Sequence, residues 1–150
     1  MIQMRHAGVY VRDLAQMQTF YQQVFHMHIL CDALELQNAL LPVLMDGEEG
    51  CIRMTKLITE QGKISGYGDM VELLEVSPRP HCFNEKGTGI HDITMPGNVH
   101  LCFGVDDLDA TLMDIKHYGG TVVIDTLFLD NGRKCAFAAD PEGNILEMIQ

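Results

Sequence analysis

The sequence predicts an α+β protein in which two βαβββ modules form one pseudo-twofold, cup-shaped mixed sheet with helices on its outside. Three observations predict this fold. The pattern H-x4-V-x-D-L occurs at residues 6–14 and again at residues 100–108. A second pattern, G-x3-E followed by apolar residues, occurs at residues 68–72 and 143–147. Between the two copies, residues 77–97 carry prolines and glycines at a density that breaks regular structure. We therefore expect a single domain over 1–150, with module one at about 3–77, a linker at about 78–97 and module two at about 98–150.

Module one begins with a strand at residues 4–12, where apolar and polar residues alternate. Asp13 is an expected N-cap, and the apolar residues after it recur every three to four positions, which predicts an amphipathic helix of about 13 residues. Strands are expected at 27–36, 51–59 and 70–76. The turn-rich residues 41–50 and 61–68 are expected to connect them.

Module two repeats this order. A strand is expected at 98–105, followed by a helix capped by Asp106 or Asp107 and ended by Gly119 and Gly120. Residues 121–129 and 133–139 flank the tight-turn signal at 130–132 and predict a hairpin. The turn at 140–144 then leads into a last strand at 145–149.

Composition narrows the function classes. A chain of 150 residues with 47% hydrophobic residues can bury a core of its own, and it contains neither a membrane-spanning apolar run nor a signal-peptide pattern, so we expect a cytoplasmic protein. A formal net charge of -11 disfavours nucleic acid as a partner. Five cysteines without C-x-x-C spacing favour reduced thiols in the core over disulfides or a zinc knuckle.

Side-chain alternation places the candidate functional residues. His6 and His100 lie on the strand face opposite their valine neighbours, and therefore away from the helices. Alternation alone leaves Glu72 and Glu75 open, but the G-x3-E match to Glu147 favours Glu72. The resulting set of two imidazoles and two carboxylates suits one divalent ion: Ni, Zn, Co, Mn or Fe. The other histidines are interpreted as ordinary polar residues.

These motifs resemble those of the vicinal oxygen chelate superfamily, which has the glyoxalase, bleomycin-resistance and extradiol dioxygenase fold. The resemblance rests on both H-x4-V-x-D-L copies, on Phe20-Tyr21 in the first helix, and on the D-P-E-G-N-x2-E run at 140–147. It covers essentially the whole chain. It implies the βαβββ modules and makes His6, Glu72, His100 and Glu147 the metal ligands, a set most similar to that of bacterial glyoxalase I. Tyr10 and Val76 stand where glutathione-using members commonly have Arg and Asn, so the substrate stays open.

The resemblance implies a metal-dependent lyase or isomerase that moves a proton next to a chelated carbonyl of a small molecule. Glu147 would be the base and Glu72 the second acid/base group. Two alternatives are an Fe(II) ring-cleaving dioxygenase and a non-enzymatic small-molecule binding or resistance protein. A homodimer is expected, with the site within one chain or shared between two. Candidates for substrate contacts are Tyr10, Cys102 and the cationic side chains Arg53, Lys56, Arg133 and Lys134.

Overall fold

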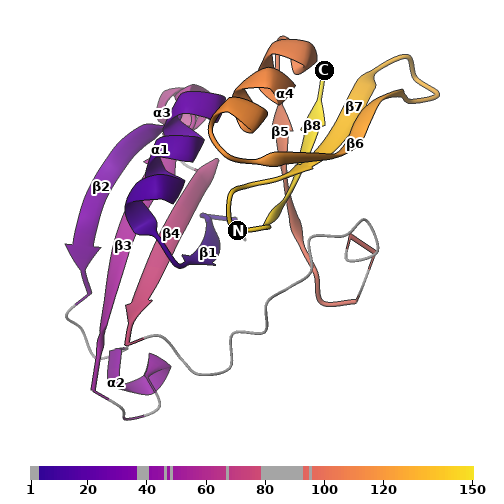
Figure 1. Cartoon of the computed structure of the whole chain (residues 1–150). Coiled ribbons are helices and arrows are strands. Elements are labelled where there is room, and N and C mark those ends of the chain that lie inside the picture. Colours follow the sequence, from indigo (N-terminus) through magenta and orange to yellow (C-terminus); the bar gives the residue numbers. More distant parts are fainter. Residues whose placement is uncertain are drawn as a thin grey trace. The chain divides into compact units, whose positions relative to one another are not determined.

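The structure is a computed structural model, and it describes residues 4–36, 41–45, 47, 49–66, 68–78, 93–94 and 96–150. The chain divides into two compact units (Figure 1). One consists of Met1–Gln22 with His26–Phe83, and we call it module one. The other consists of Asn84–Gln150 with Gln23–Phe25, and we call it module two. Most of the expected linker, residues 79–92, lies outside the described residues.

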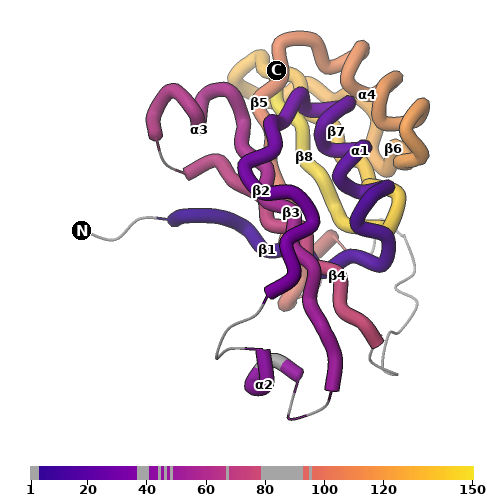
Figure 2. Tube along the Cα trace, turned by 90° about the vertical axis from the view of Figure 1, so that its left-hand side faces the viewer, coloured from indigo at the N-terminus to yellow at the C-terminus, as the bar shows by residue number. Residues whose placement is uncertain are grey.

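Module one has a four-stranded mixed sheet in the order β1-β4-β3-β2. Strand β1 is parallel to β4, and the other neighbours are antiparallel. Figure 2 shows β2, β3 and β4 running side by side. The elements of this module are β1 (Ala7–Val11), α1 (Leu14–Phe25), β2 (His28–Glu35), α2 (Leu41–Leu44), β3 (Cys51–Ile58), α3 (Glu60–Ser65) and β4 (Met70–Ser77).

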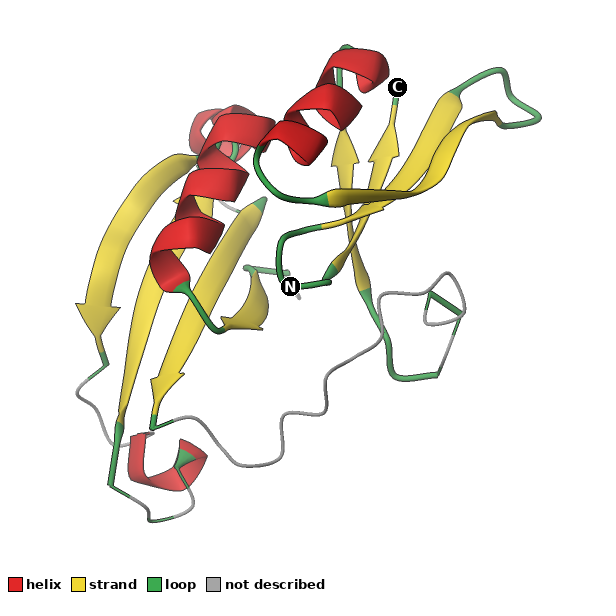
Figure 3. Ribbon diagram, in the orientation of Figure 1, coloured by secondary structure: helices red, strands yellow, loops and turns green. Residues whose placement is uncertain are grey.

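Module two repeats the arrangement with the strand order β5-β8-β7-β6, in which β5 is parallel to β8 (Figure 3). Its elements are β5 (His100–Gly104), α4 (Leu108–His117), β6 (Thr121–Phe128), β7 (Lys134–Ala139) and β8 (Ile145–Ile149). The predicted α+β class with two similar modules is therefore confirmed. The joining of both sheets into one cup stays a prediction.

The two longer helices, α1 and α4, begin in the same way and each buries one apolar face. The carboxylate of Asp13 accepts a hydrogen bond from the Gln16 N–H at 2.9 Å, and that of Asp107 accepts one from the Ala110 N–H at 3.0 Å. These caps satisfy N–H groups that have no partner inside the helix. Apolar residues at helical spacing then become the core, including Leu14, Met17, Phe20 and Tyr21 in α1 and Leu108, Leu112 and Ile115 in α4.

Two sequence predictions about connections were wrong. Residues 61–68 were expected to form a turn, but α3 occupies most of this segment. Thr59 starts the helix by accepting a hydrogen bond from the Gly62 N–H at 3.0 Å, and Gly66 ends it in the left-handed conformation, with φ of 77°. The short α2 likewise lies within the expected loop at 41–50.

The prediction that the cysteines are reduced thiols in the core is only partly correct. Those in the described residues are free, but only Cys135 among them is buried. Cys102 is exposed because β5 alternates and Cys102 lies on its open face. Cys82 lies outside the described residues. No described helix has the length and apolar character needed to cross a membrane.

Candidate functional site

The first candidate pair is His6 with Glu72, in module one. The Nε2 atom of His6 lies 3.1 Å from Oε2 of Glu72. The parallel pairing of β1 and β4 produces this contact, because Gly8 pairs with Glu72 and His6 lies two residues before Gly8 on the same strand face. The Glu72 side chain is only 13% exposed, whereas that of His6 is 39% exposed. The imidazole therefore lies between a shielded carboxylate and solvent.

The second pair, His100 with Glu147, has the same geometry in module two. Nε2 of His100 lies 3.1 Å from Oε2 of Glu147. In the β5–β8 pairing, Cys102 is opposite Glu147, and His100 again lies two residues before the paired position. The side chains are 42% and 19% exposed, close to the values of the first pair. The repeat in sequence is thus a repeat in side-chain geometry.

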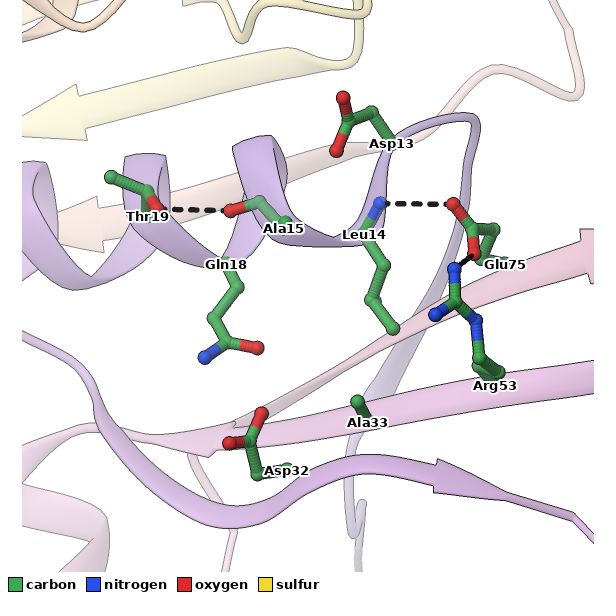
Figure 4. A pocket seen from close by; sticks show the side chains of 9 residues that line it. All are labelled: Asp13, Leu14, Ala15, Gln18, Thr19, Asp32, Ala33, Arg53 and Glu75. Atoms are coloured by element: carbon green, nitrogen blue, oxygen red, sulfur yellow. Dashed lines mark hydrogen bonds and ion pairs between the residues drawn. The ribbon is translucent and has the colours of Figure 1, made fainter.

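Glu75, the alternative to Glu72, bonds on the other side of the module-one sheet. It accepts a hydrogen bond from the Leu14 N–H at 3.3 Å, at the start of α1, and forms an ion pair with Arg53 (Figure 4). The hydrogen bond to Glu75 raises the pKa of Arg53. This carboxylate therefore stabilises the helix start, and Glu72 is the one that contacts a histidine.

The two pairs differ in the residue opposite each glutamate on the antiparallel neighbour strand. Lys56 of β3 is opposite Glu72, and its ammonium forms an ion pair with Oε1 of that carboxylate. Phe137 of β7 is opposite Glu147. The ring of Phe137 lies edge-on to the His100 imidazole, with 5.7 Å between the ring centroids. One carboxylate therefore has a cation beside it, and the other has an aromatic ring.

Two thiols flank Glu147. The Sγ atom of Cys135 donates a hydrogen bond to Oε1 of Glu147 at 3.5 Å. Partial desolvation, a hydrogen bond to Glu147 and the negative charge of Glu147 together raise the pKa of Cys102 to about 11. The same causes raise the pKa of Cys135. Both thiols are therefore protonated at neutral pH and can donate to Glu147.

The donor set fits a divalent metal ion. Imidazole nitrogen and carboxylate oxygen are the usual ligands of borderline divalent ions. The 3.1 Å separation in each pair matches two neighbouring ligands held at about 2.1 Å from one ion with roughly 90° between them. Within either described module, no three His, Cys, Asp or Glu side chains form a group that could hold a metal ion, and each module contributes one His–Glu pair.

The remaining candidates lie in different places. Tyr10 is exposed and shares the open face of β1 with Gly8. Arg53 lies instead on the α1 side, where it lines a cavity of about 280 Å³ together with Glu75, Gln18 and Asp32 (Figure 4). Arg53 and the His6–Glu72 pair are thus on opposite faces of the sheet.

The sequence named Lys56 only as one of several cations, and did not pair it with Glu72. The signal that could have found the pair is the register between residues 51–58 and 70–77, which form neighbouring antiparallel strands. That register depends on the connection between the two strands. Residues 61–68 of this connection were expected to form a turn rather than a helix.

The chain is similar in fold to solved structures that share little sequence with it. A glyoxalase family protein from Bacillus cereus matches with a TM-score of 0.82 and 14% identity, over 99% of this chain and 93% of that one. A glyoxalase/bleomycin resistance protein/dioxygenase family enzyme from Burkholderia phytofirmans matches with a TM-score of 0.58 and 19% identity, over 97% and 95% of the two chains. A mutant of glyoxalase I from Zea mays matches with a TM-score of 0.60 and 21% identity, over 99% of this chain and 45% of that one.

A search of curated proteins finds no match. The profile of the Glyoxalase/Bleomycin resistance protein/Dioxygenase superfamily matches residues 3–148. This match spans both modules, including both His–Glu pairs. It agrees with the repeated modules and with the structural similarities, and it confirms the family predicted from the sequence. The chain belongs to the glyoxalase/bleomycin resistance protein/dioxygenase superfamily.

Proposed function

We propose that this protein is a divalent-metal-dependent lyase or isomerase of the glyoxalase type that acts on a small carbonyl compound. The observation that carries the proposal is the repeated pair: a histidine and a glutamate at corresponding positions of each module, with 3.1 Å between donor atoms in both. Two unrelated polar contacts would not be expected to share strand register, exposure and distance. The proposed ligands of a single ion are His6, Glu72, His100 and Glu147.

A bound divalent ion would supply Lewis-acid stabilisation of negative charge on a chelated substrate oxygen. The proton then has to leave the carbon next to the carbonyl. We assign its removal to the carboxylate of Glu147, and assign Glu72 as the second acid/base group. Glu147 suits the base role because its described contacts are an imidazole and two thiols, none of which neutralises its charge in the way that Lys56 neutralises that of Glu72.

The surroundings of Glu147 also limit the access of water to its carboxylate. Its side chain is 19% exposed, and the ring of Phe137 lies nearly perpendicular to the neighbouring imidazole. The thiols of Cys102 and Cys135 donate only weak hydrogen bonds to the carboxylate oxygens of Glu147. An oxygen can lose such a bond at little cost when it accepts a proton.

Metal uptake tests the proposal. The chain is stripped with a chelator, reloaded separately with Ni, Zn, Co, Mn and Fe(II), and its metal content measured by mass spectrometry. We expect about one ion per chain, lost in His6→Ala and in His100→Ala and retained in His117→Ala, a control at the end of α4. Equal uptake in all four proteins would rule out the proposed ligands, and no uptake by any of them would favour a binding protein that works without metal.

A further inference from the structure

Lys56 is a cation next to a proposed ligand, and its position is defined by the strand pairing. It lies opposite Glu72 in the β3–β4 register and bonds to Oε1, while His6 contacts Oε2 of the same carboxylate. An ion held by His6 Nε2 and Glu72 Oε2 would therefore leave the Lys56 contact in place. The ammonium would remain beside the Glu72 carboxylate that would hold the ion.

Lys56 also has hydrogen-bonding capacity to spare. An ammonium group has three N–H donors, and Glu72 is the one partner found for Lys56 among the described residues. Its side chain is 28% exposed, so the remaining donors can reach a bound molecule. The Arg53 guanidinium cannot take this role, because it pairs with Glu75 on the α1 side of the sheet.

The charges of the site point to the kind of molecule that would bind. Two neutral imidazoles, two carboxylates and a divalent ion sum to zero, so Lys56 adds a positive charge beside the Glu72 carboxylate of the loaded site. The chain as a whole carries a formal net charge of -11, which would repel an anion unless a local cation overrides it. In module two, Phe137 occupies the register position that Lys56 has in module one, while the charge of Arg133 acts on Cys102.

We infer that Lys56 binds an anionic oxygen of the substrate, and that the substrate class is a monoanion with two chelating oxygens, such as a 2-hydroxy or 2-oxo carboxylate. This inference rests on the proposed function, because it requires the metal. It adds a specificity residue and a charge requirement that the four ligands by themselves do not impose. A charge-assisted hydrogen bond of this kind typically changes affinity by about tenfold or more.

The test uses two probes that have the same size and chelating oxygens but differ in charge: glycolate and its neutral amide, glycolamide. Both are titrated into the cobalt-loaded chain, and binding is followed by visible absorption. We expect Lys56→Met to weaken glycolate about tenfold or more and glycolamide less than about twofold. Lys56→Arg should keep glycolate within about threefold, because it preserves the charge. Lys63→Met, which removes a lysine paired with Glu60 on α3, serves as the matched control and should change neither.

The outcomes separate this inference from the proposed function. Equal effects of Lys56→Met on both probes, or no effect on either, would show that Lys56 only neutralises Glu72, and would overturn the inference while leaving the metal site standing. A wild-type chain that takes up no metal would overturn the proposed function and the inference together. Metal content is measured on every variant, so that a loss of cobalt is not mistaken for a loss of anion binding.

Discussion

Glu72 and Glu75 lie on the same strand, β4, yet they bond to different parts of module one: Glu72 to the His6 imidazole and Glu75 to the first turn of α1. Three residues along a strand bring a side chain to the opposite face. This relationship separates a carboxylate available for chemistry from one that stabilises the fold.

Replacing Glu75 should therefore affect the stability of the fold, whereas replacing Glu72 should affect metal uptake. Glu75→Gln removes a negative charge from the N-terminus of α1, and we expect it to lower the free energy of unfolding by about 1 kcal/mol with metal uptake unchanged. Glu72→Gln should leave thermal stability of the metal-free chain within a few degrees of wild type but abolish stoichiometric metal uptake. Differential scanning calorimetry and metal analysis distinguish the two. Metal loss in Glu75→Gln instead would mean that the wrong carboxylate was chosen.

Glu147→Gln should leave the fold intact and lower turnover about a hundredfold or more, because an amide cannot accept the proton, and metal content is measured alongside because Glu147 is also a proposed ligand. The measurement is hydrogen–deuterium exchange at the carbon next to the carbonyl of the substrate, followed by proton NMR, with circular dichroism to monitor the fold. Near-normal exchange in this variant would rule out Glu147 as the base.

Cys102 should react slowly despite its exposure. With a pKa of about 11 instead of 9.0, its thiolate fraction near neutral pH is about a hundredfold below that of an ordinary thiol. Iodoacetamide labelling of the metal-free native chain, read out by peptide mass spectrometry, should therefore accelerate with rising pH up to about pH 11, and labelling of the urea-unfolded chain should level off at lower pH. Glu147→Gln removes a hydrogen bond and a negative charge that both raise this pKa, so labelling of Cys102 should become faster in that variant.

The end of α4 gives a stability prediction with an internal control. A Cβ at Gly120 would lie 2.7 Å from the carbonyl oxygen of Ala139 and 2.8 Å from a methyl group of Ile115, and backbone at this contact has no room to move. We expect Gly120→Ala to destabilise module two by about 1–3 kcal/mol. Gly104→Ala meets no atom within 4 Å and should be close to neutral. Chemical denaturation of both variants compares them directly, and equal midpoints would contradict the close approach.

Local patterns account for most of what the sequence predicted correctly. Alternation over β1 and β5 placed His6 and His100 on the open faces, and the aspartates at the ends of these strands marked the helix starts. Each of these signals depends on residues only a few positions apart. The repeated G-x3-E pattern then identified Glu72 as the counterpart of Glu147. Alternation within β4 alone could not choose between Glu72 and Glu75.

What the sequence did not predict depends on residues far apart in the chain. Lys56 meets Glu72 only through strand register, and α3 sets that register by occupying the connection between β3 and β4. The general interpretation of the cysteines as core thiols is wrong for Cys102, although alternation over residues 98–105 already places it on the same face as His100. Hydropathy does not distinguish a thiol in the core from a thiol on the opposite side of the same strand.

The contrast between Lys56 and Phe137 implies that the halves of this protein are no longer interchangeable, although their strand pairing is. Because both residues occupy the same register position, exchanging them as Lys56→Phe with Phe137→Lys would transfer the ammonium from one carboxylate to the other without changing the amino-acid composition or net charge. The duplicated fold therefore presents the same carboxylate in two different electrostatic surroundings, and two side chains account for the difference.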